Sequence, residues 1–119
     1  MIRKIINWFR SQEPRIGIRR VTFVYYIVLQ SESESFLKVG ITRNPSGLIN
    51  RYYQFDANLI KKEAFSDRRK AYKREQEVHI VLDKYRYAPK VKFSGHTECF
   101  NSEAINNVVS AQKSIKPVG

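Results

Sequence analysis

The clearest hydrophobic pattern in the chain is a pair of apolar runs separated by a short polar segment. Residues 21–29, VTFVYYIVL, are β-branched and aromatic, which is typical of a buried strand. The segment QSESES reads as a turn, and residues 36–42, FLKVGIT, form the second run. The two runs therefore predict a β-hairpin. Tyr25 and Tyr26 would point to opposite faces of its first strand, because side chains alternate along a strand.

Two shorter elements follow this hairpin. Asn44-Pro45-Ser46 supplies turn chemistry and an N-cap for a short helix, which we expect from Leu48 to about Tyr53. Residues 58–66, NLIKKEAFS, alternate weakly between apolar and polar positions and predict a third strand.

A long helix and a final strand–helix pair complete the pattern. Asp67 can cap a helix that runs to about Tyr85, with apolar side chains at helical spacing: Ala71, Val78 and Leu82. The segment TECF predicts a short strand, and Asn101 or Ser102 can cap a last helix. The apolar side chains expected to face inward from that helix are Ile105, Val108 and Val109. The order β-β-α-β-α-β-α predicts an α+β fold, with a small antiparallel or mixed sheet of three to four strands flanked by helices.

A basic segment precedes this domain. Residues 1–20 place apolar side chains on one face of a short amphipathic helix that would dock on the domain: Ile2, Ile5, Ile6 and Phe9. The chain of 119 residues fits one domain, which we expect over residues 21–119.

The charge balance indicates a polyanionic partner. The chain has 22 Lys and Arg against 11 Asp and Glu, a net charge of +11. The excess lies in residues 1–20 and 61–92, and concentrated positive charge favours binding to nucleic acid, DNA or RNA. The side chains expected to contact phosphates are Lys61, Lys62, Arg68, Arg69, Lys70, Lys73 and Arg74.

Cysteine content and hydropathy exclude other classes of protein. Cys99 is the single cysteine, which excludes an internal disulfide framework and suits a reducing cytoplasm. No apolar run approaches the length of about 18 residues that a transmembrane helix needs. We therefore expect a cytoplasmic protein without a membrane partner.

A series of short motifs resembles the GIY-YIG nuclease superfamily. Phe23-Val24-Tyr25 stands where that family has Gly-Ile-Tyr, and Lys38-Val39-Gly40 stands where it has Tyr-Ile-Gly. Arg51 and Glu75 follow in the order of the family's arginine and metal-binding glutamate. The lysine of the second motif, with REQEVH and then GHTECF, is similar to the phage T5-type branch. The resemblance spans about residues 22–101, and it implies a protein of a phage-infected or bacterial cell.

The resemblance implies a metal-dependent DNA endonuclease that leaves 5′-phosphate and 3′-hydroxyl ends. Tyr25 would orient or deprotonate the attacking water, with Lys38 lowering the tyrosine pKa from about 10. Arg51 would bind the scissile phosphate, and Glu75 would hold one Mg²⁺ or Mn²⁺ ion. Gly40 would leave room for the substrate beside the hairpin.

His79 stands four residues after Glu75, and residues at this spacing share one face of a helix. The spacing favours Glu75 over Glu77 as the metal ligand. His79 would bind phosphate, relay a proton or assist the metal-bound water; the alternative is a hydrogen bond to a nearby loop.

The accessory positions each have more than one interpretation. Tyr26 is either packed in the core or an accessory aromatic of the site. Tyr52 and Tyr53 either stack on exposed bases or pack the short helix. Glu98 is expected to brace one of the basic site residues, and Asn101 to contribute an amide.

Two rival functions remain at this point. Phe23 replaces the first glycine of the motif and Lys38 replaces a tyrosine, and these departures favour the first rival, a fold retained for DNA binding with cleavage weak or lost. The second rival is a protein-binding or inhibitory factor that uses its charge on an acidic partner. One site per chain predicts a nick, and a double-strand break would need a homodimer.

Overall fold

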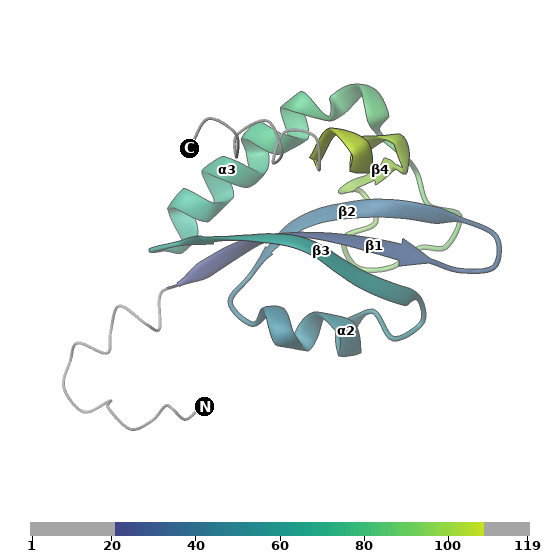
Figure 1. Cartoon of the computed structure of the whole chain (residues 1–119), viewed down its shortest axis with the longest axis horizontal. Helices are drawn as coiled ribbons and strands as arrows, with labels where there is room; N and C mark the ends of the chain where they lie inside the picture. Colours follow the sequence, from purple (N-terminus) through teal and green to yellow (C-terminus); the bar gives the residue numbers. More distant parts are fainter. Residues whose placement is uncertain (1–20, 109–119) are drawn as a thin grey trace.

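The predicted hairpin forms the centre of the sheet. In the computed structural model, which describes residues 21–108, β1 (Thr22–Gln30) pairs antiparallel with β2 (Ser35–Thr42). β3 (Asp56–Phe65) pairs with the other edge of β1, and β4 (Cys99–Asn101) pairs with β2. The order is β3-β1-β2-β4 and every pairing is antiparallel, which confirms the predicted α+β class (Figure 1).

Short and long helices cover opposite faces of this sheet (Figure 1). The 3₁₀ turn η1 (Pro45–Gly47) and helix α2 (Leu48–Arg51) lie on one face. Helix α3 (Arg68–Val81) and the helical residues 103–108 lie on the other.

The start of α3 is as predicted, but its end is not. The Asp67 carboxylate accepts a hydrogen bond from the Lys70 backbone N–H at 2.9 Å, which confirms the cap. The helix ends at Val81, four residues before the expected Tyr85. Leu82 leaves helical backbone geometry, and the 3₁₀ turn η2 (Asp83–Tyr85) carries the chain away.

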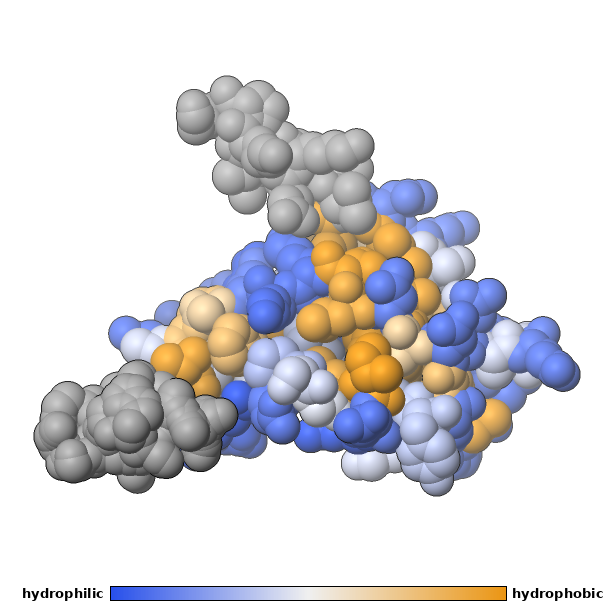
Figure 2. Space-filling view, turned by 60° about the horizontal axis from the view of Figure 1, so that its bottom comes forward, coloured by the Kyte–Doolittle hydropathy of each residue, from blue (hydrophilic) through white to orange (hydrophobic). Residues whose placement is uncertain are grey.

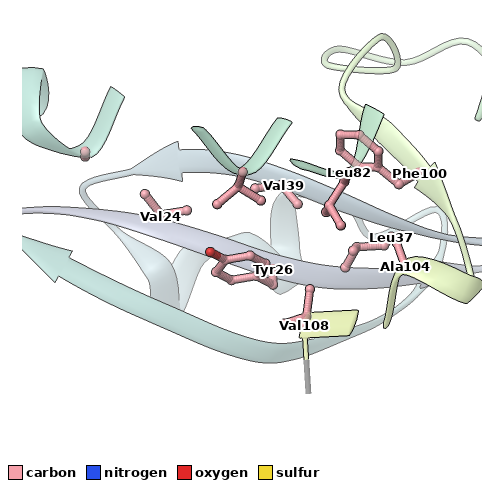
Figure 3. Close-up of a cluster of buried hydrophobic side chains, with 10 residues drawn as sticks. Val24, Tyr26, Leu37, Val39, Leu82, Phe100, Ala104 and Val108 are labelled. Carbon is pink, nitrogen blue, oxygen red and sulfur yellow. The ribbon is translucent and has the colours of Figure 1, made fainter. Parts of the chain in front are cut away.

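The sheet has a hydrophobic cluster on each face. Under α3 the cluster consists of Val24, Tyr26, Leu37, Val39, Ala71, Val78, Leu82, Phe100, Ala104 and Val108 (Figure 3). On the α2 side it consists of Tyr25, Ile27, Leu29, Phe36, Leu48, Tyr52, Phe55 and Cys99. Tyr25 and Tyr26 therefore do point to opposite faces, as their alternation predicted.

The final helix packs through one residue more than the sequence predicted. Ala104, which was not expected to face inward, is fully buried in the cluster under α3, and Ile105 packs against that cluster and is partly buried. Val108 is buried as predicted. Val109 and the expected amphipathic arm, residues 1–20, lie outside the described residues.

Hydrophilic side chains cover much of the face shown in Figure 2, and apolar side chains gather in a central band and in a smaller patch at the left. Among residues 21–108, no helix has the length and hydropathy that crossing a bilayer requires.

Candidate active site

A pocket of about 280 Å³ opens where β1 and β2 meet α2, the first half of α3 and the loop before β4. Its lining includes the four side chains predicted to converge: Tyr25, Lys38, Arg51 and Glu75. They come from four different elements, so only the folded chain brings them together.

Tyr25 and Gly40 form the floor of this pocket. They are directly opposite each other in the β1–β2 ladder. A Cβ atom on Gly40 would lie 2.7 Å from the Tyr25 Oη and 3.0 Å from the Lys38 Nζ. Only glycine lets the phenol and the ammonium approach this point of the strand. The absence of a side chain at Gly40 therefore leaves the space that the Tyr25 hydroxyl and the Lys38 ammonium occupy.

Lys38 is a buried cation with a carboxylate partner. Its side chain is 3% exposed, and Nζ donates a hydrogen bond to the Glu98 Oε1 at 2.9 Å. The Nζ atom also lies 5.3 Å from the centre of the Tyr25 ring. Burial lowers the pKa of Lys38, but Tyr25, Tyr52 and Glu98 outweigh burial and raise it above its ordinary value. Lys38 is thus a permanent positive charge, and Glu98 braces it as predicted.

The pKa of Tyr25 moves opposite to the expected direction. Burial raises this pKa to about 12, because the charged phenolate would lose its water. The Lys38 charge lowers the pKa as expected, but by less, and the hydrogen bond to Tyr52 adds to the increase. Tyr25 is therefore a neutral phenol at neutral pH.

Glu75 is one of the two carboxylates that line the pocket, with Glu98. Its side chain is 5% exposed, and burial, then the charge of Glu98, raises its pKa, while His79 and Lys38 lower it. Glu77 is more than half exposed and pairs instead with Arg74, at 3.7 Å. The choice of Glu75 over Glu77 agrees with this geometry.

Arg51 is exposed on α2 at the mouth of the pocket. Its guanidinium carbon lies 6.0 Å from the centre of the Tyr52 ring. It has no ion pair with a carboxylate in the part of the chain that the structure describes. The guanidinium is thus free to bind an anion that enters the pocket.

Three predicted positions do not line this pocket. The His79 Nε2–H donates to the Val39 carbonyl at 3.1 Å, and its buried ring lies against Phe100. Asn101 accepts a hydrogen bond from the Glu103 backbone N–H at 2.9 Å and so begins the last helix. Tyr26 donates to the Glu63 carboxylate at 2.9 Å on the opposite face of the sheet.

The predicted phosphate-binding residues divide into two groups. Lys61 and Arg74 are paired with Glu63, at 3.5 and 3.1 Å, and Lys62 lies over the ring of Phe23. The other four are exposed along the first half of α3, and we call them the α3 basic strip: Arg68, Arg69, Lys70 and Lys73. Arg68 also lines the pocket.

The α3 basic strip lies where helix stability disfavours positive charge. The N-terminal end of a helix carries partial positive charge, and the first turn of α3 contains no acidic residue. The α3 basic strip is therefore not stabilised by the helix dipole. Its position favours a role in binding an external anion.

The donors in the pocket fit a magnesium-type ion. Mg²⁺ keeps most of its water and needs only one or two protein carboxylates, which Glu75 and Glu98 supply. Within residues 21–108 there is no cluster of three or more His, Cys, Asp or Glu side chains that could enclose a metal. This donor set does not suit a zinc site.

Two residues of the pocket were not predicted as site elements. Tyr72 lies at the rim half-exposed, and Gly95 adopts a φ of +90° beside Lys38. Tyr72 precedes Glu75 by three residues, so the shared helix face was the one available signal for it. Tyr52, an expected accessory residue, is buried and contacts the Tyr25 hydroxyl, a contact between distant segments that the sequence did not indicate.

Comparison with known proteins gave one match. The family described as the T5orf172 domain matches residues 22–115, from the first residue of β1 to beyond the last described helix. No curated protein and no solved structure matched. Because the family match covers most of the sequence and the whole sheet, this chain belongs to the T5orf172 domain family.

Proposed function

We propose that this protein is a metal-dependent endonuclease that hydrolyses phosphodiester bonds in DNA. The observation that carries the proposal is the single pocket lined by Tyr25, Lys38, Arg51 and Glu75. The T5orf172 family is associated with endonuclease-like domains, and the net charge of +11 suits a nucleic-acid substrate.

Hydrolysis of a phosphodiester needs a place for the phosphate and a source of positive charge. Arg51 can hold a phosphate oxygen at the mouth of the pocket through its guanidinium fork. Glu75, with Glu98 nearby, would hold Mg²⁺ or Mn²⁺. When bound, such an ion would stabilise the charge that develops on the phosphate.

The attacking water would lie against Tyr25. The Lys38 ammonium beside it orients the phenol oxygen and favours the loss of a proton from the water. With a pKa of about 12, only about one Tyr25 in 10⁵ is ionised at pH 7. Tyr25 therefore has to act from its neutral form.

The α3 basic strip would hold the DNA backbone beside the pocket. Contacts from lysine and arginine to phosphates give affinity without reading the base sequence. We infer low intrinsic sequence specificity and, with one proposed active site per chain, cleavage of one strand at a time.

The test uses two tyrosines that are neighbours in β1 but face opposite sides of the sheet. We expect Tyr25→Phe to reduce nicking of supercoiled plasmid in Mg²⁺ by about 10²- to 10⁴-fold, which is the usual contribution of a group that transfers a proton. Tyr26→Phe should nick at nearly the wild-type rate once folding is checked. Equal activity in the two variants would refute the assignment of Tyr25.

The rise in the Tyr25 pKa favours one alternative, a DNA-binding module with feeble cleavage. This alternative predicts salt-sensitive binding to plasmid DNA without nicking in either Mg²⁺ or Mn²⁺. Absence of DNA binding even at low salt would instead indicate a protein partner.

A further inference from the structure

Tyr52 supplies a buried hydroxyl to the pocket that the proposed chemistry has not used. It is 4% exposed, and its Oη lies 2.9 Å from the Tyr25 Oη. Residues 25 and 52 are 27 positions apart in the chain, so their hydroxyls come into contact only when the domain is folded. In a buried pair of hydroxyls such as this one, one hydroxyl donates the hydrogen bond and the other accepts it.

The neighbours of Tyr25 determine which of the two hydroxyls donates. The Lys38 ammonium has only N–H donors, and it lies beside the Tyr25 hydroxyl. The Tyr25 oxygen therefore accepts from Lys38, and its own proton is directed to the other close partner, the Tyr52 oxygen. The hydrogen-bonded chain runs from Lys38 through Tyr25 to Tyr52.

Tyr52 is held firmly in this position. Its backbone N–H donates to the Leu48 carbonyl at 3.0 Å, and its ring packs edge-on against Phe93 at 6.0 Å. Its ring also adjoins Arg51, the residue proposed to bind phosphate. Tyr52 thus contacts the proposed base through its hydroxyl and adjoins the proposed phosphate ligand through its ring.

We propose that Tyr52 is the proton-relay partner of Tyr25, an inference that rests on the proposed nuclease function. As the water attacks phosphorus, its O–H bond breaks, the proton binds the Tyr25 oxygen, and the bond from phosphorus to the leaving 3′ oxygen breaks. The original Tyr25 proton passes at the same time to the Tyr52 oxygen. The Tyr52 proton passes to a phosphate oxygen at Arg51 or to water in the pocket, from which the leaving 3′ oxygen takes up one proton. Both tyrosines end neutral, and no free phenolate forms.

The relay explains how a phenol that is neutral at pH 7 can accept a proton. Direct ionisation of Tyr25 would require its proton to reach solvent from a position that is 1% exposed. Transfer to Tyr52 needs a movement across a single 2.9 Å contact. Tyr52 acts on the attacking water only through Tyr25, and its own proton goes to the phosphate or to pocket water, so the two tyrosines share the proton transfer.

The experiment measures single-turnover nicking of plasmid DNA by the full chain in Mg²⁺ between pH 6.5 and 9.5. We expect Tyr52→Phe, which removes only the hydroxyl, to nick about 10²-fold more slowly than wild type at pH 7. Its remaining rate should rise about tenfold per pH unit, because Tyr25 must then ionise. The wild-type rate should be nearly flat across the same range.

The matched control is Tyr53→Phe, since Tyr53 is the next residue and is 82% exposed. It should behave as wild type in rate and pH profile. Wild-type nicking rates in mixtures of H₂O and D₂O give a test that needs no variant. The relay predicts that the rate depends on the deuterium fraction along a curve, because several protons move in the same step.

Two results separate the relay from the nuclease function. If wild type nicks and Tyr25→Phe does not, while Tyr52→Phe matches Tyr53→Phe, the relay is overturned and the nuclease function stands. A linear dependence on deuterium fraction also overturns the relay. If wild type does not nick at all, the nuclease function fails and the relay fails with it.

Discussion

Replacing Gly40 by alanine is the sharpest steric test of the site, because it adds one methyl group at the contact between its two central side chains. The new Cβ would lie 2.7 Å from the Tyr25 Oη and 2.8 Å from the Tyr25 Cζ. Ordinary contacts of a Cβ atom begin near 3.4 Å. The phenol must therefore retreat by roughly 0.7 Å, since packed interiors have no spare volume.

That retreat has a cost in both stability and rate. Tyr25 is 1% exposed and is held by Tyr52, so it cannot rotate away freely. Adding a methylene to a packed site typically costs about 1–3 kcal/mol, and 1 kcal/mol lowers the melting temperature of a domain of this size by about 4–8 °C. A displacement approaching 1 Å at a reacting group can reduce the rate by about 10²-fold.

The assay combines calorimetry, DNA binding and plasmid nicking on Gly40→Ala and on Gly47→Ala. In Gly47→Ala the added Cβ would meet the end of the exposed Asn44 side chain, 2.8 Å away, which can rotate aside. We expect Gly40→Ala to lose about 10²-fold in nicking and several degrees in melting temperature, with DNA affinity unchanged. Gly47→Ala should resemble wild type. Normal nicking by a folded Gly40→Ala protein would refute the proposed placement of Tyr25.

Three further predictions test the electrostatics and the DNA surface. Burial disfavours the charged Glu75 carboxylate and raises its pKa. Glu75→Gln should therefore raise the melting temperature of the protein at pH 7.5 while abolishing nicking. A lower melting temperature in this variant would contradict the expectation. Tyr72→Ala should weaken DNA binding in fluorescence anisotropy by about tenfold through loss of a stacking surface, while Tyr53→Ala has no effect; equal affinities would exclude stacking at the rim. Burial tends to raise the pKa of Glu63, but Arg74 and Tyr26 outweigh it and lower that pKa, so its stabilisation is present above about pH 4.5 and is lost as the pH falls further. Calorimetry from pH 7 to pH 3 should show a smaller loss of melting temperature in Glu63→Gln than in wild type.

Much of the fold could be predicted from local patterns. The two apolar runs defined the hairpin, and Asp67 marked the start of α3, because strand alternation and helix capping are properties of adjacent residues. The end of α3 was predicted four residues too late, and the burial of Ala104 in the last helix was not predicted. The end of α3 depends on where the chain turns to reach β4.

The candidate site was predictable in its members but not in its energetics. The order of motifs placed Tyr25, Lys38, Arg51 and Glu75 at one pocket. It could not show that burial outweighs the Lys38 charge at Tyr25, because burial depends on packing from distant segments. The Tyr25–Tyr52 contact could not be predicted for the same reason.

The central claim is that one pocket on this protein cleaves DNA with a metal held by Glu75. The most direct measurement compares plasmid nicking by wild type, Glu75→Gln and Glu77→Gln in Mg²⁺ and in EDTA. The two glutamates lie two residues apart on α3, but Glu75 is buried in the pocket and Glu77 is exposed beside Arg74. We predict nicking by wild type and Glu77→Gln in Mg²⁺ only, and none by Glu75→Gln. Nicking by folded Glu75→Gln at the wild-type rate, or undiminished nicking in EDTA, would contradict the account.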